Sequence, residues 1–423
     1  MRDINQRLAA FGVKIPDILL PGPEVDPEKW AVIACDQHTQ DPSYWETVRA
    51  ITDSAPSALN LILPETFLGD GSGEPRISSI HASMRKYLKG GVFSAPSTCV
   101  IYVERETSRY ALRRGLVMAV DLELYDWKTG NQALIRATEE TIEERLPPRM
   151  EIRRNASLET SHIILLMDDD KDALLPALAE RAKKKPPLYS TPLMLDSGSI
   201  TGWALDSEED WEILAGGLEK LMYKDGIGRR YETREPFLFA VGDGNHSLAA
   251  AKAVWDEYKK THAGETGLEN HPCRWALVEL ENLYDPGVIF EPIHRLVFGT
   301  DPDMLVSALS AQTGITLSPH VPENRIISAE SNSPCFISAL LQPLLDDFVM
   351  EHGLSIDYIH GEKELCRLAQ DTTRPATGVL LPAVEKKDLF KTVTGTGALP
   401  RKSFSMGASA DKRFYFECRS LLQ

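Results

Sequence analysis

The residues with the clearest potential for chemistry form a glycine turn, Gly-Asp-Gly-Asn-His, at positions 242–246 of the 423-residue chain. An apolar run over Pro236–Val241 precedes it and an amphipathic segment over Ser247–Lys260 follows it, so we predict a strand, a tight turn and a helix. The start of a helix presents unpaired backbone N–H groups and the positive end of its dipole, which favour a phosphate or a carboxylate. The turn is therefore a candidate anion site.

The side chains of this turn suggest roles in such a site. Asp243 could hold Mg²⁺ and His246 could donate to a phosphate oxygen, while Gly242 and Gly244 let the backbone approach a ligand closely. The alternative is an ordinary strand–helix turn in which Asn245 is the helix N-cap. The turn lacks the Gly-Lys-Ser/Thr of a P-loop and the Gly-x-Gly-x-x-Gly of a dinucleotide fold, so both of those readings are weak.

A second candidate follows the apolar run Trp30–Ala34, which we predict to be a buried strand. The sequence Cys-Asp-Gln-His at 35–38 lies at the end of this strand, where ligands often bind in α/β sheets. Asp36 could be a general base, and His38 a second acid/base group or a phosphate contact. Alternatively, Asp36 caps the next turn and His38 lies on the surface. A Cys35–His38 nucleophile pair is less favoured, because Cys35 is placed like a core-facing strand residue.

Two charged segments in the first half of the chain hold further candidates. Glu139, Thr141 and Arg149 lie in Arg136–Arg149, which could instead be a charged amphipathic helix with ion pairs four residues apart. Asp168–Asp170 could bind a metal, but a run of N-caps for the following helix is favoured.

Two segments in the second half could bind an anion. His294 and Arg295 lie where a turn joins an apolar Leu-Val-Phe strand, and the pair could grip an anion or be solvated. Near the C-terminus, Lys402 and Ser403 lie in the stretch Leu399–Gly407 and could close over a phosphate. The alternative for that stretch is a surface loop before the last strand.

Composition narrows the classes of partner. The chain has 62 Asp and Glu against 46 Lys and Arg, a net charge of −16, which argues against binding to nucleic acid or to an anionic membrane. The N-terminus has no apolar core of a signal peptide, and the longest apolar runs are too short to span a bilayer. The six cysteines are scattered, so we expect free thiols in a cytoplasmic protein. The oligomeric state stays open between a monomer and a homodimer.

The elements that must position these residues are of mixed type. Thr98–Glu104 and Leu116–Leu124 are predicted to be antiparallel strands, the second with an alternation that buries one face. The other predicted elements are a strand at Ser161–Met167, a helix at about Ala173–Ala182, a helix at Ser207–Lys224 with a capping box of Ser207 and Asp210, and a final strand at Arg413–Cys418. The predicted fold class is α/β, of mixed α+β type, with substantial antiparallel sheet.

Taken together and in this order, these segments resemble the DUF1015 family, a domain family of unknown function. The stretches that carry the resemblance are the Asp36 segment, Arg136–Arg149, Ser161–Asp169, Gly242–Ala251, Ile293–Val297 and Lys402–Ser403. The Asp-Gly-x-His turn is also similar to the signature turn of the ParB/sulfiredoxin superfamily, which includes free serine kinases.

In that superfamily the turn binds nucleotide phosphate, so the resemblance implies this role for Asp243, Gly244, Asn245 and His246. Ser247 stands where the superfamily usually has an arginine, which removes a planar phosphate-binding fork. Arg295, Arg401 or Lys402 could compensate.

The resemblance implies a ParB/sulfiredoxin-like core over residues 1–299 with a β-rich insertion at about 50–230. A C-terminal α/β segment over 300–423 would return a Lys-Ser loop to the site.

The resulting hypothesis is a phosphotransferase that uses ATP or ADP with Mg²⁺ and acts on a small hydroxyl compound such as free serine. Its proposed catalytic residues are Asp36, His38 and His246. The proposed phosphate-binding residues are Gly242, Asp243, Gly244, Asn245, Ser247, Lys402 and Ser403, with Asp243 also as the metal ligand. The proposed substrate contacts are Glu139, Thr141, Arg149, His294 and Arg295. The alternative is a nucleotide-binding regulatory protein without turnover, and DNA binding of the ParB type is the poorest of the three.

Overall fold

The computed structural model divides the chain into two compact units. It describes residues 2–39, 41–68, 73–107, 109–128, 130–224, 231, 236–309, 315–320, 324–331, 337–383 and 385–422. The larger unit contains residues 1–137, 141–288 and 408–423, and the smaller unit contains 138–140 and 289–407. The sequence placed a boundary at residue 299. The chain in fact leaves the larger unit after Val288, because the strand that follows pairs within the smaller unit, and it returns at Ala408.

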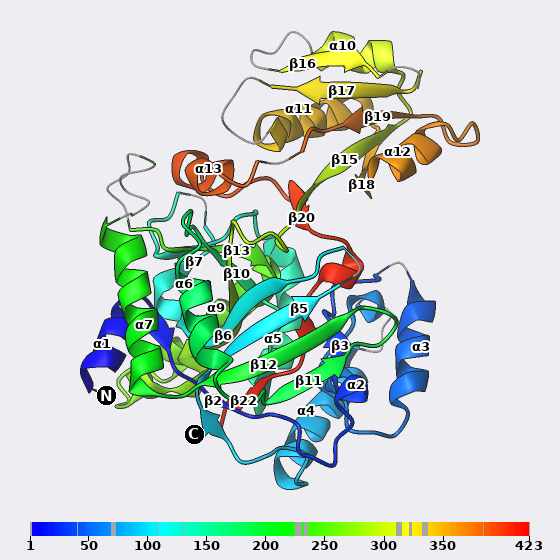
Figure 1. Ribbon diagram of the computed structural model, residues 1–423. Helices are drawn as coiled ribbons and strands as arrows, with labels where there is room; N and C mark the ends of the chain where they lie inside the picture. The colour runs from blue at the N-terminus through cyan, green and yellow to red at the C-terminus, as the bar shows by residue number, and fades with distance from the viewer. Residues whose placement is uncertain are drawn as a thin grey trace. The chain divides into compact units, whose positions relative to one another are not determined.

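A mixed sheet forms the centre of the larger unit (Figure 1). Its strands, in spatial order, are β11 (Tyr189–Pro192), β12 (Ser199–Leu205), β5 (Val100–Glu106), β6 (Arg113–Asp121), β14 (Trp275–Asn282), β10 (Ile164–Met167), β13 (Phe239–Asp243), β8 (Ile135–Arg136) and β7 (Tyr125–Asp126), and β1 (Val13–Lys14) pairs with β6. The pairs β10–β14, β13–β8 and β7–β8 are parallel and the other pairs are antiparallel. The mixed α/β class predicted from the sequence is confirmed.

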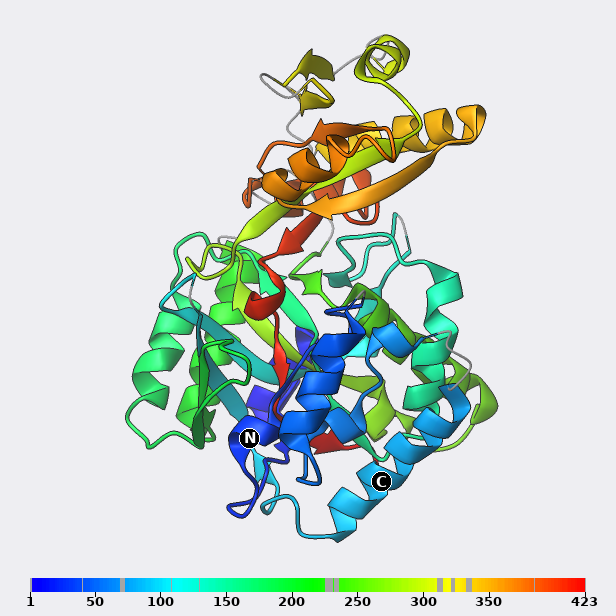
Figure 2. The same cartoon turned by 90° about the vertical axis from the view of Figure 1, so that its right-hand side faces the viewer.

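Helices cover both faces of this sheet. On one face pack α1 (Arg2–Ala10), α6 (Leu174–Ala182), α7 (Glu208–Glu219) and α9 (Asn245–Thr261). On the other face pack α2 (Pro27–Trp30), α3 (Pro42–Thr52) and α4 (Gly73–Lys89). Met118 on β6 joins the first core and its neighbour Val117 joins the second, as the two-residue period of a strand requires. Figure 1 shows α1 beside α7, and Figure 2 turns the α2–α4 side toward the viewer.

Two predictions about elements in the larger unit need correction. The segment Leu116–Leu124 was expected to bury one face, but β6 is buried on both faces and ends at Asp121, where a 3₁₀ turn begins. The helix offered as the alternative for Arg136–Arg149 forms only over the last part of that segment. After β8 and an irregular stretch, a 3₁₀ turn over Glu143–Arg145 leads into α5 (Leu146–Arg154), whose first turn holds two prolines that suit a helix start.

Other predictions for this unit are confirmed by local chemistry. The capping box at the start of α7 has the Ser207 hydroxyl accepting from Asp210 N–H and the Asp210 carboxylate accepting from Ser207 N–H. Asp169 Oδ2 accepts from the N–H groups of Ala173 and Leu174, so the acidic run caps α6. Among the described residues, no group of three or more His, Cys, Asp or Glu could hold a metal ion.

The C-terminal residues complete the larger unit. The two-stranded pairs are β21 (Phe414–Tyr415) with β3 (Val32–Ile33), β22 (Cys418–Ser420) with β9 (Leu158–Thr160), and β2 (Asp17–Ile18) with β4 (Ser97–Thr98). In Figure 2 the red C-terminal segment runs beside blue N-terminal segments. The predicted strands at Trp30–Ala34 and Arg413–Cys418 are therefore short and pair with each other.

The smaller unit has its own sheet with helices on both sides. Its strands, in order, are β16 (Thr316–Pro319), β17 (Ile326–Glu330), β19 (Ala376–Leu380), β15 (Phe290–Phe298) and β18 (Ser355–His360), and β20 (Phe404–Met406) pairs with the start of β15. Its helices are α10 (Pro302–Leu309), α11 (Ile337–His352), α12 (Glu362–Ala369) and α13 (Asp388–Thr396). Residues 291–295, predicted to join a turn to a strand, lie wholly inside β15.

The five cysteines in the described part of the chain are free thiols, and Cys335 lies outside that part. None of the described helices is both long enough and apolar enough to cross a membrane.

Candidate functional site

The predicted glycine turn lies where β13 delivers the chain to α9. Gly244 has a φ of 78°, in the left-handed region that glycine adopts without strain. A Cβ atom added there would lie 3.1 Å from Ile163 Cα, so the turn packs closely on the segment before β10. Gly244 itself is the N-cap of α9 and Asn245 is the first helical residue, which corrects the alternative that Asn245 caps the helix.

A lysine that the sequence analysis missed lies at this turn. Lys412 Nζ is 3.1 Å from Asp243 Oδ2, and the side chains are only 8% and 16% exposed. Asp243 Oδ1 accepts from Gly244 N–H at 3.0 Å. The larger unit thus supplies a cation of its own at the glycine turn.

Asp243 is a poor fit to the expected Mg²⁺. One of its oxygens is paired with an ammonium group, and among the described residues it belongs to no group of three or more His, Cys, Asp or Glu that could hold a metal ion. A cation next to the carboxylate repels a divalent ion. The site therefore does not match a protein-held Mg²⁺.

Asp36 lies at the end of the β3 segment, as predicted. Gln37 Nε2 donates to Asp36 Oδ1 at 3.1 Å, and Asp36 Oδ2 is 3.8 Å from His162 Nε2. The helix that follows is capped by Asp41, whose Oδ1 accepts from Tyr44 N–H. Asp36 is therefore not the cap of α3.

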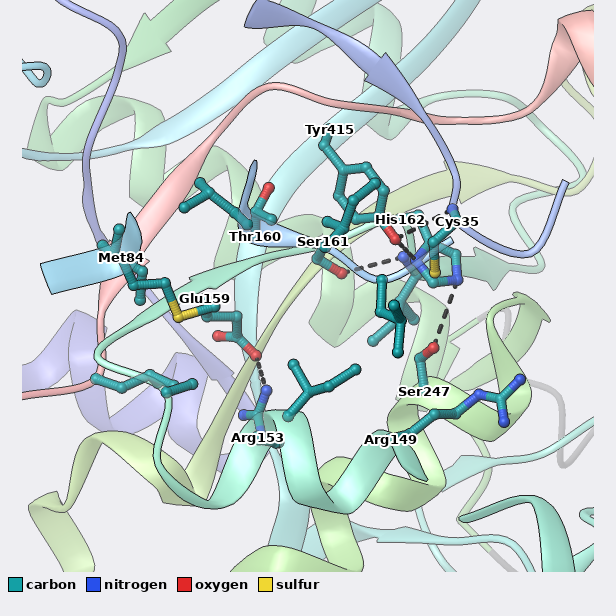
Figure 3. A pocket seen from close by; sticks show the side chains of 18 of the residues that line it. Cys35, Met84, Arg149, Arg153, Glu159, Thr160, Ser161, His162, Ser247 and Tyr415 are labelled. Carbon is teal, nitrogen blue, oxygen red and sulfur yellow. Dashed lines mark hydrogen bonds and ion pairs between the residues drawn. The ribbon is translucent and has the colours of Figure 1, made fainter. Parts of the chain in front are cut away.

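His162 joins the two predicted segments. Its Nε2 is 3.5 Å from Ser247 Oγ, in the first turn of α9 (Figure 3). The same nitrogen faces Asp36 Oδ2. Its Nδ1 is 2.6 Å from the hydroxyl of Tyr415, which also accepts from Cys35 N–H at 3.4 Å. We therefore assign the hydroxyl proton to the bond with Nδ1 and the imidazole proton to Nε2.

This arrangement is not a serine nucleophile site. In a Ser-His-Asp triad, the serine and the carboxylate contact opposite nitrogens of the histidine. Here Ser247 and Asp36 face the same nitrogen. A cysteine nucleophile is disfavoured too, because burial, with the nearby Asp36 charge, raises the pKa of the Cys35 thiol well above its usual value.

The two histidines predicted to be catalytic, His38 and His246, both make structural contacts. The His38 ring stacks on Tyr44 with centroids 3.6 Å apart, and burial lowers the pKa of His38. His246 Nε2 accepts from Ile142 N–H at 3.3 Å, so this nitrogen cannot donate to a phosphate. Thr141, the residue before Ile142, is thereby held near the start of α9.

Arg149 lies in the wall of a cavity that reaches the His162 group. The cavity is about 140 Å³ and its lining includes Cys35, His162, Ser247 and Tyr415. Arg149 pairs with Glu65, which is also in the lining, and its Nη1 donates to the carbonyl of Arg145. In Figure 3 Arg149 lies beside Ser247, and Met84 lies toward the opposite side of the view.

The remaining predicted residues belong to the smaller unit. Glu139 accepts from Ser403 N–H at 2.9 Å, next to Lys402, and burial raises the pKa of Glu139 although Lys402 opposes the shift. His294 Nδ1 accepts from Leu381 N–H at 3.1 Å, and burial, with the Arg295 charge, lowers the pKa of His294 to about 4.

Arg295 is 1% exposed, which rules out a solvated pair with His294. Its Nε donates to Gln342 Oε1 at 2.6 Å, and its guanidinium lies 4.7 Å from the centre of the Tyr358 ring. Burial lowers the pKa of Arg295 to about 10.

The structure therefore gathers Asp36, the turn at 242–247 and Arg149 in the larger unit, with three residues that sequence reasoning missed: His162, Lys412 and Tyr415. His162 lies in a segment that carried the family resemblance, which was a usable signal. Lys412 and Tyr415 gave no signal, since Lys412 lies just before the final strand predicted at Arg413–Cys418 and Tyr415 lies within it.

Comparisons with known proteins place the chain in a family. A family model described as a protein of unknown function (DUF1015) matches residues 19–374. The comparison with curated proteins gave no match. Similar solved structures include a conserved hypothetical protein from Pyrococcus furiosus, with 9% identity, a TM-score of 0.35 and coverage of 72% of this chain and 95% of that one. They also include mutant free serine kinases in complex with AMP and with ADP, each with 10% identity, a TM-score of 0.37 and coverage of 72% of this chain and 92% of that one. The extent of the family match shows that the chain belongs to the DUF1015 family.

Proposed function

We propose that this protein transfers a phosphoryl group from a nucleotide to a small hydroxyl compound at the site in the larger unit. One observation carries the proposal. Two groups face His162 Nε2. Ser247 Oγ, in the first turn of α9, lies 3.5 Å from this nitrogen, and Asp36 Oδ2, from a segment distant in the sequence, lies 3.8 Å from it. A group suited to anions and a group suited to take a proton thus lie side by side.

The turn would bind the phosphates. The start of α9 offers the positive end of a 17-residue helix to the oxygens of a phosphate. Lys412, although paired with Asp243, is a cation at the same turn and would offset part of the charge that develops on the transferred group. The similarity of this turn to the ParB/sulfiredoxin signature supports a nucleotide as the phosphate source.

Asp36 would accept the proton of the acceptor hydroxyl. As the hydroxyl oxygen forms a bond to phosphorus, the bond from phosphorus to the leaving phosphate oxygen breaks, and the proton passes to Asp36 Oδ2. His162 is a positioning residue: its Nε2–H faces both Asp36 and Ser247, and Tyr415 fixes its tautomer. The second candidate is nucleotide binding without turnover, which the Asp243–Lys412 pair favours because it already neutralises the cation at the turn.

The test separates binding from transfer. Binding of ATP and ADP is measured by calorimetry, and phosphorylated products from a pool of small alcohols and amino acids are sought by ³¹P NMR. Asp36→Asn should keep the nucleotide Kd within about threefold and reduce transfer by at least 100-fold. Glu46→Gln, an exposed change on α3, is the control and should alter neither.

Nucleotide binding without any product in the wild-type protein would select the regulatory function. The absence of both binding and product would refute the proposal.

A further inference from the structure

We infer that the hydroxyl acceptor is an alcohol with an apolar body, held in the cavity next to His162, and not a free amino acid. This inference rests on the proposed function for the reaction but not for the binding of the alcohol. The cavity of about 140 Å³ belongs entirely to the larger unit. Its size and the chemistry of its wall define the ligand class.

The body of the cavity is apolar. One segment of its wall consists of Leu61, Ile62 and Leu63. Met84 on α4 and Leu158 on β9 are two further apolar residues in the wall. These five residues are each less than 9% exposed, so the wall is part of the hydrophobic core of the α2–α4 side. A cavity of about 150 Å³ with such a lining holds one benzene ring. The present cavity is therefore large enough for one ring or a branched chain of similar size.

The two carboxylates in the cavity wall, Glu159 and Glu65, are already paired within the protein. Glu159 Oε1 pairs with Arg153 at 2.5 Å, and Glu159 Oε2 accepts from Leu277 N–H at 3.1 Å and from Arg419 at 2.5 Å. Arg149 and Glu65 pair with each other. The ammonium and carboxylate groups of a free amino acid would lose their water here and would compete with these pairs, which is costly.

The neutral polar groups lie together where the cavity reaches α9. Ser247 Oγ and the Tyr415 hydroxyl contact opposite nitrogens of His162, and Figure 3 shows all three on the side of the cavity away from Met84. A hydroxyl at this end would lie beside the nitrogen that faces Asp36. An apolar body would then extend along the aliphatic wall, which matches an alcohol carried on a ring or branched chain.

The experiment measures alcohol binding without nucleotide. Benzyl alcohol and L-serine are titrated separately into the full-length protein and followed by ligand-observed NMR and calorimetry. Benzyl alcohol should bind, and L-serine at a tenfold higher concentration should not displace it. Ala156→Met places a larger side chain in the cavity wall and should weaken benzyl alcohol at least tenfold. Ala50→Met, the same change at an exposed position of α3, should have no effect.

A second variant guards against failure of the first to fold. Met84→Ala enlarges the cavity and should shift the preference from benzyl alcohol to the two-ring 2-naphthalenemethanol by at least tenfold. Displacement by L-serine, or equal benzyl alcohol binding in wild-type and Ala156→Met proteins, would overturn the inference. Benzyl alcohol binding that responds to the cavity variants, without phosphoryl transfer from ATP or ADP, would refute only the proposed function. Phosphoryl transfer to serine but not to benzyl alcohol would refute only this inference.

Discussion

Neutralising Asp243 should strengthen nucleotide binding, because its carboxylate is a negative charge at the position proposed for phosphate. The carboxylate accepts from Gly244 N–H at 3.0 Å and pairs with Lys412 at 3.1 Å. Asp243→Asn keeps the shape and the oxygen that accepts from Gly244. It removes the repulsion of the phosphate and releases Lys412 from its partner.

The size of the effect follows from the distances and burial of this pair. Unit charges about 4 Å apart interact by about 1 kcal/mol in bulk water and by about 4 kcal/mol at the effective dielectric constant of a site near the protein surface. Asp243 is 16% exposed, so a value of about 1.4–2.8 kcal/mol lies between these limits. We therefore expect ADP to bind ten- to a hundredfold more tightly to Asp243→Asn, and less tightly by a similar factor to Lys412→Met.

The assay is calorimetric titration of ADP and ATP at low and high salt, with and without Mg²⁺, and urea unfolding serves as the stability control. Both variants break a largely buried ion pair, so both should lower the free energy of unfolding by about 1–3 kcal/mol. Only the proposed electrostatic role gives them opposite effects on nucleotide binding. Weaker binding in Asp243→Asn that depends on Mg²⁺ would make Asp243 a metal ligand and refute the reasoning. Unchanged binding in both variants would remove the turn as the phosphate site.

Three further predictions test the turn, the thiol and the buried histidine. Gly244→Ala should lower the free energy of unfolding by about 2 kcal/mol, since it adds a close approach to Ile163 to left-handed backbone strain. Gly264→Ala, at a φ of 94° in open space, should cost only about 1 kcal/mol, and equal costs in urea unfolding would contradict the packing. Burial raises the pKa of the Cys35 thiol, so it should react with iodoacetamide at pH 8 at least about tenfold more slowly than a small free thiol. Cys35→Ala should retain phosphoryl transfer. Loss of phosphoryl transfer in this variant would restore a nucleophilic role for Cys35. His294 should titrate by NMR near pH 4, so up to about 3 kcal/mol of the free energy of unfolding should be lost as the pH falls from 6.5 toward 4. His294→Asn keeps an acceptor for Leu381 N–H and should remove this pH dependence. A titration midpoint near pH 6.5 would contradict the burial of His294.

The elements that sequence could predict are those whose signals are local. The strand, turn and helix around residues 236–260 are set by an apolar run, two glycines and an amphipathic period, and the capping box of α7 by residues three apart. The burial of β6 on both faces could not be read in this way. It depends on helices that come before and after β6 in the sequence, with α2, α3 and α4 on one face of the sheet and α1, α6, α7 and α9 on the other.

The candidate site shows the same limit. Asp36 and the glycine turn were found because each follows a strand, where polar residues stand out from an apolar run. His162 became relevant only because β10 pairs with β13, which sets Ile164 opposite Asp243. Arg295 and Lys402, chosen for their charge, lie in the smaller unit with local partners of their own. Charge alone therefore could not single out Lys412, the lysine that pairs with Asp243.

The return of the C-terminal segment to the larger unit explains how an acidic chain provides a cation at this turn. Arg413 is fully buried and pairs with Glu279 on β14 and with Glu417. Buried ion pairs contribute little net stability against apolar replacements, but they make any shift of the segment costly because it would strand a charge. The anchor at Arg413 fixes its neighbour Lys412 beside Asp243 and orients Tyr415 toward His162. A chain with a net charge of −16 thus places one lysine at the turn where the phosphate is proposed to bind. The same buried ion pairs of Arg413 hold Tyr415 against His162, the histidine that faces Asp36.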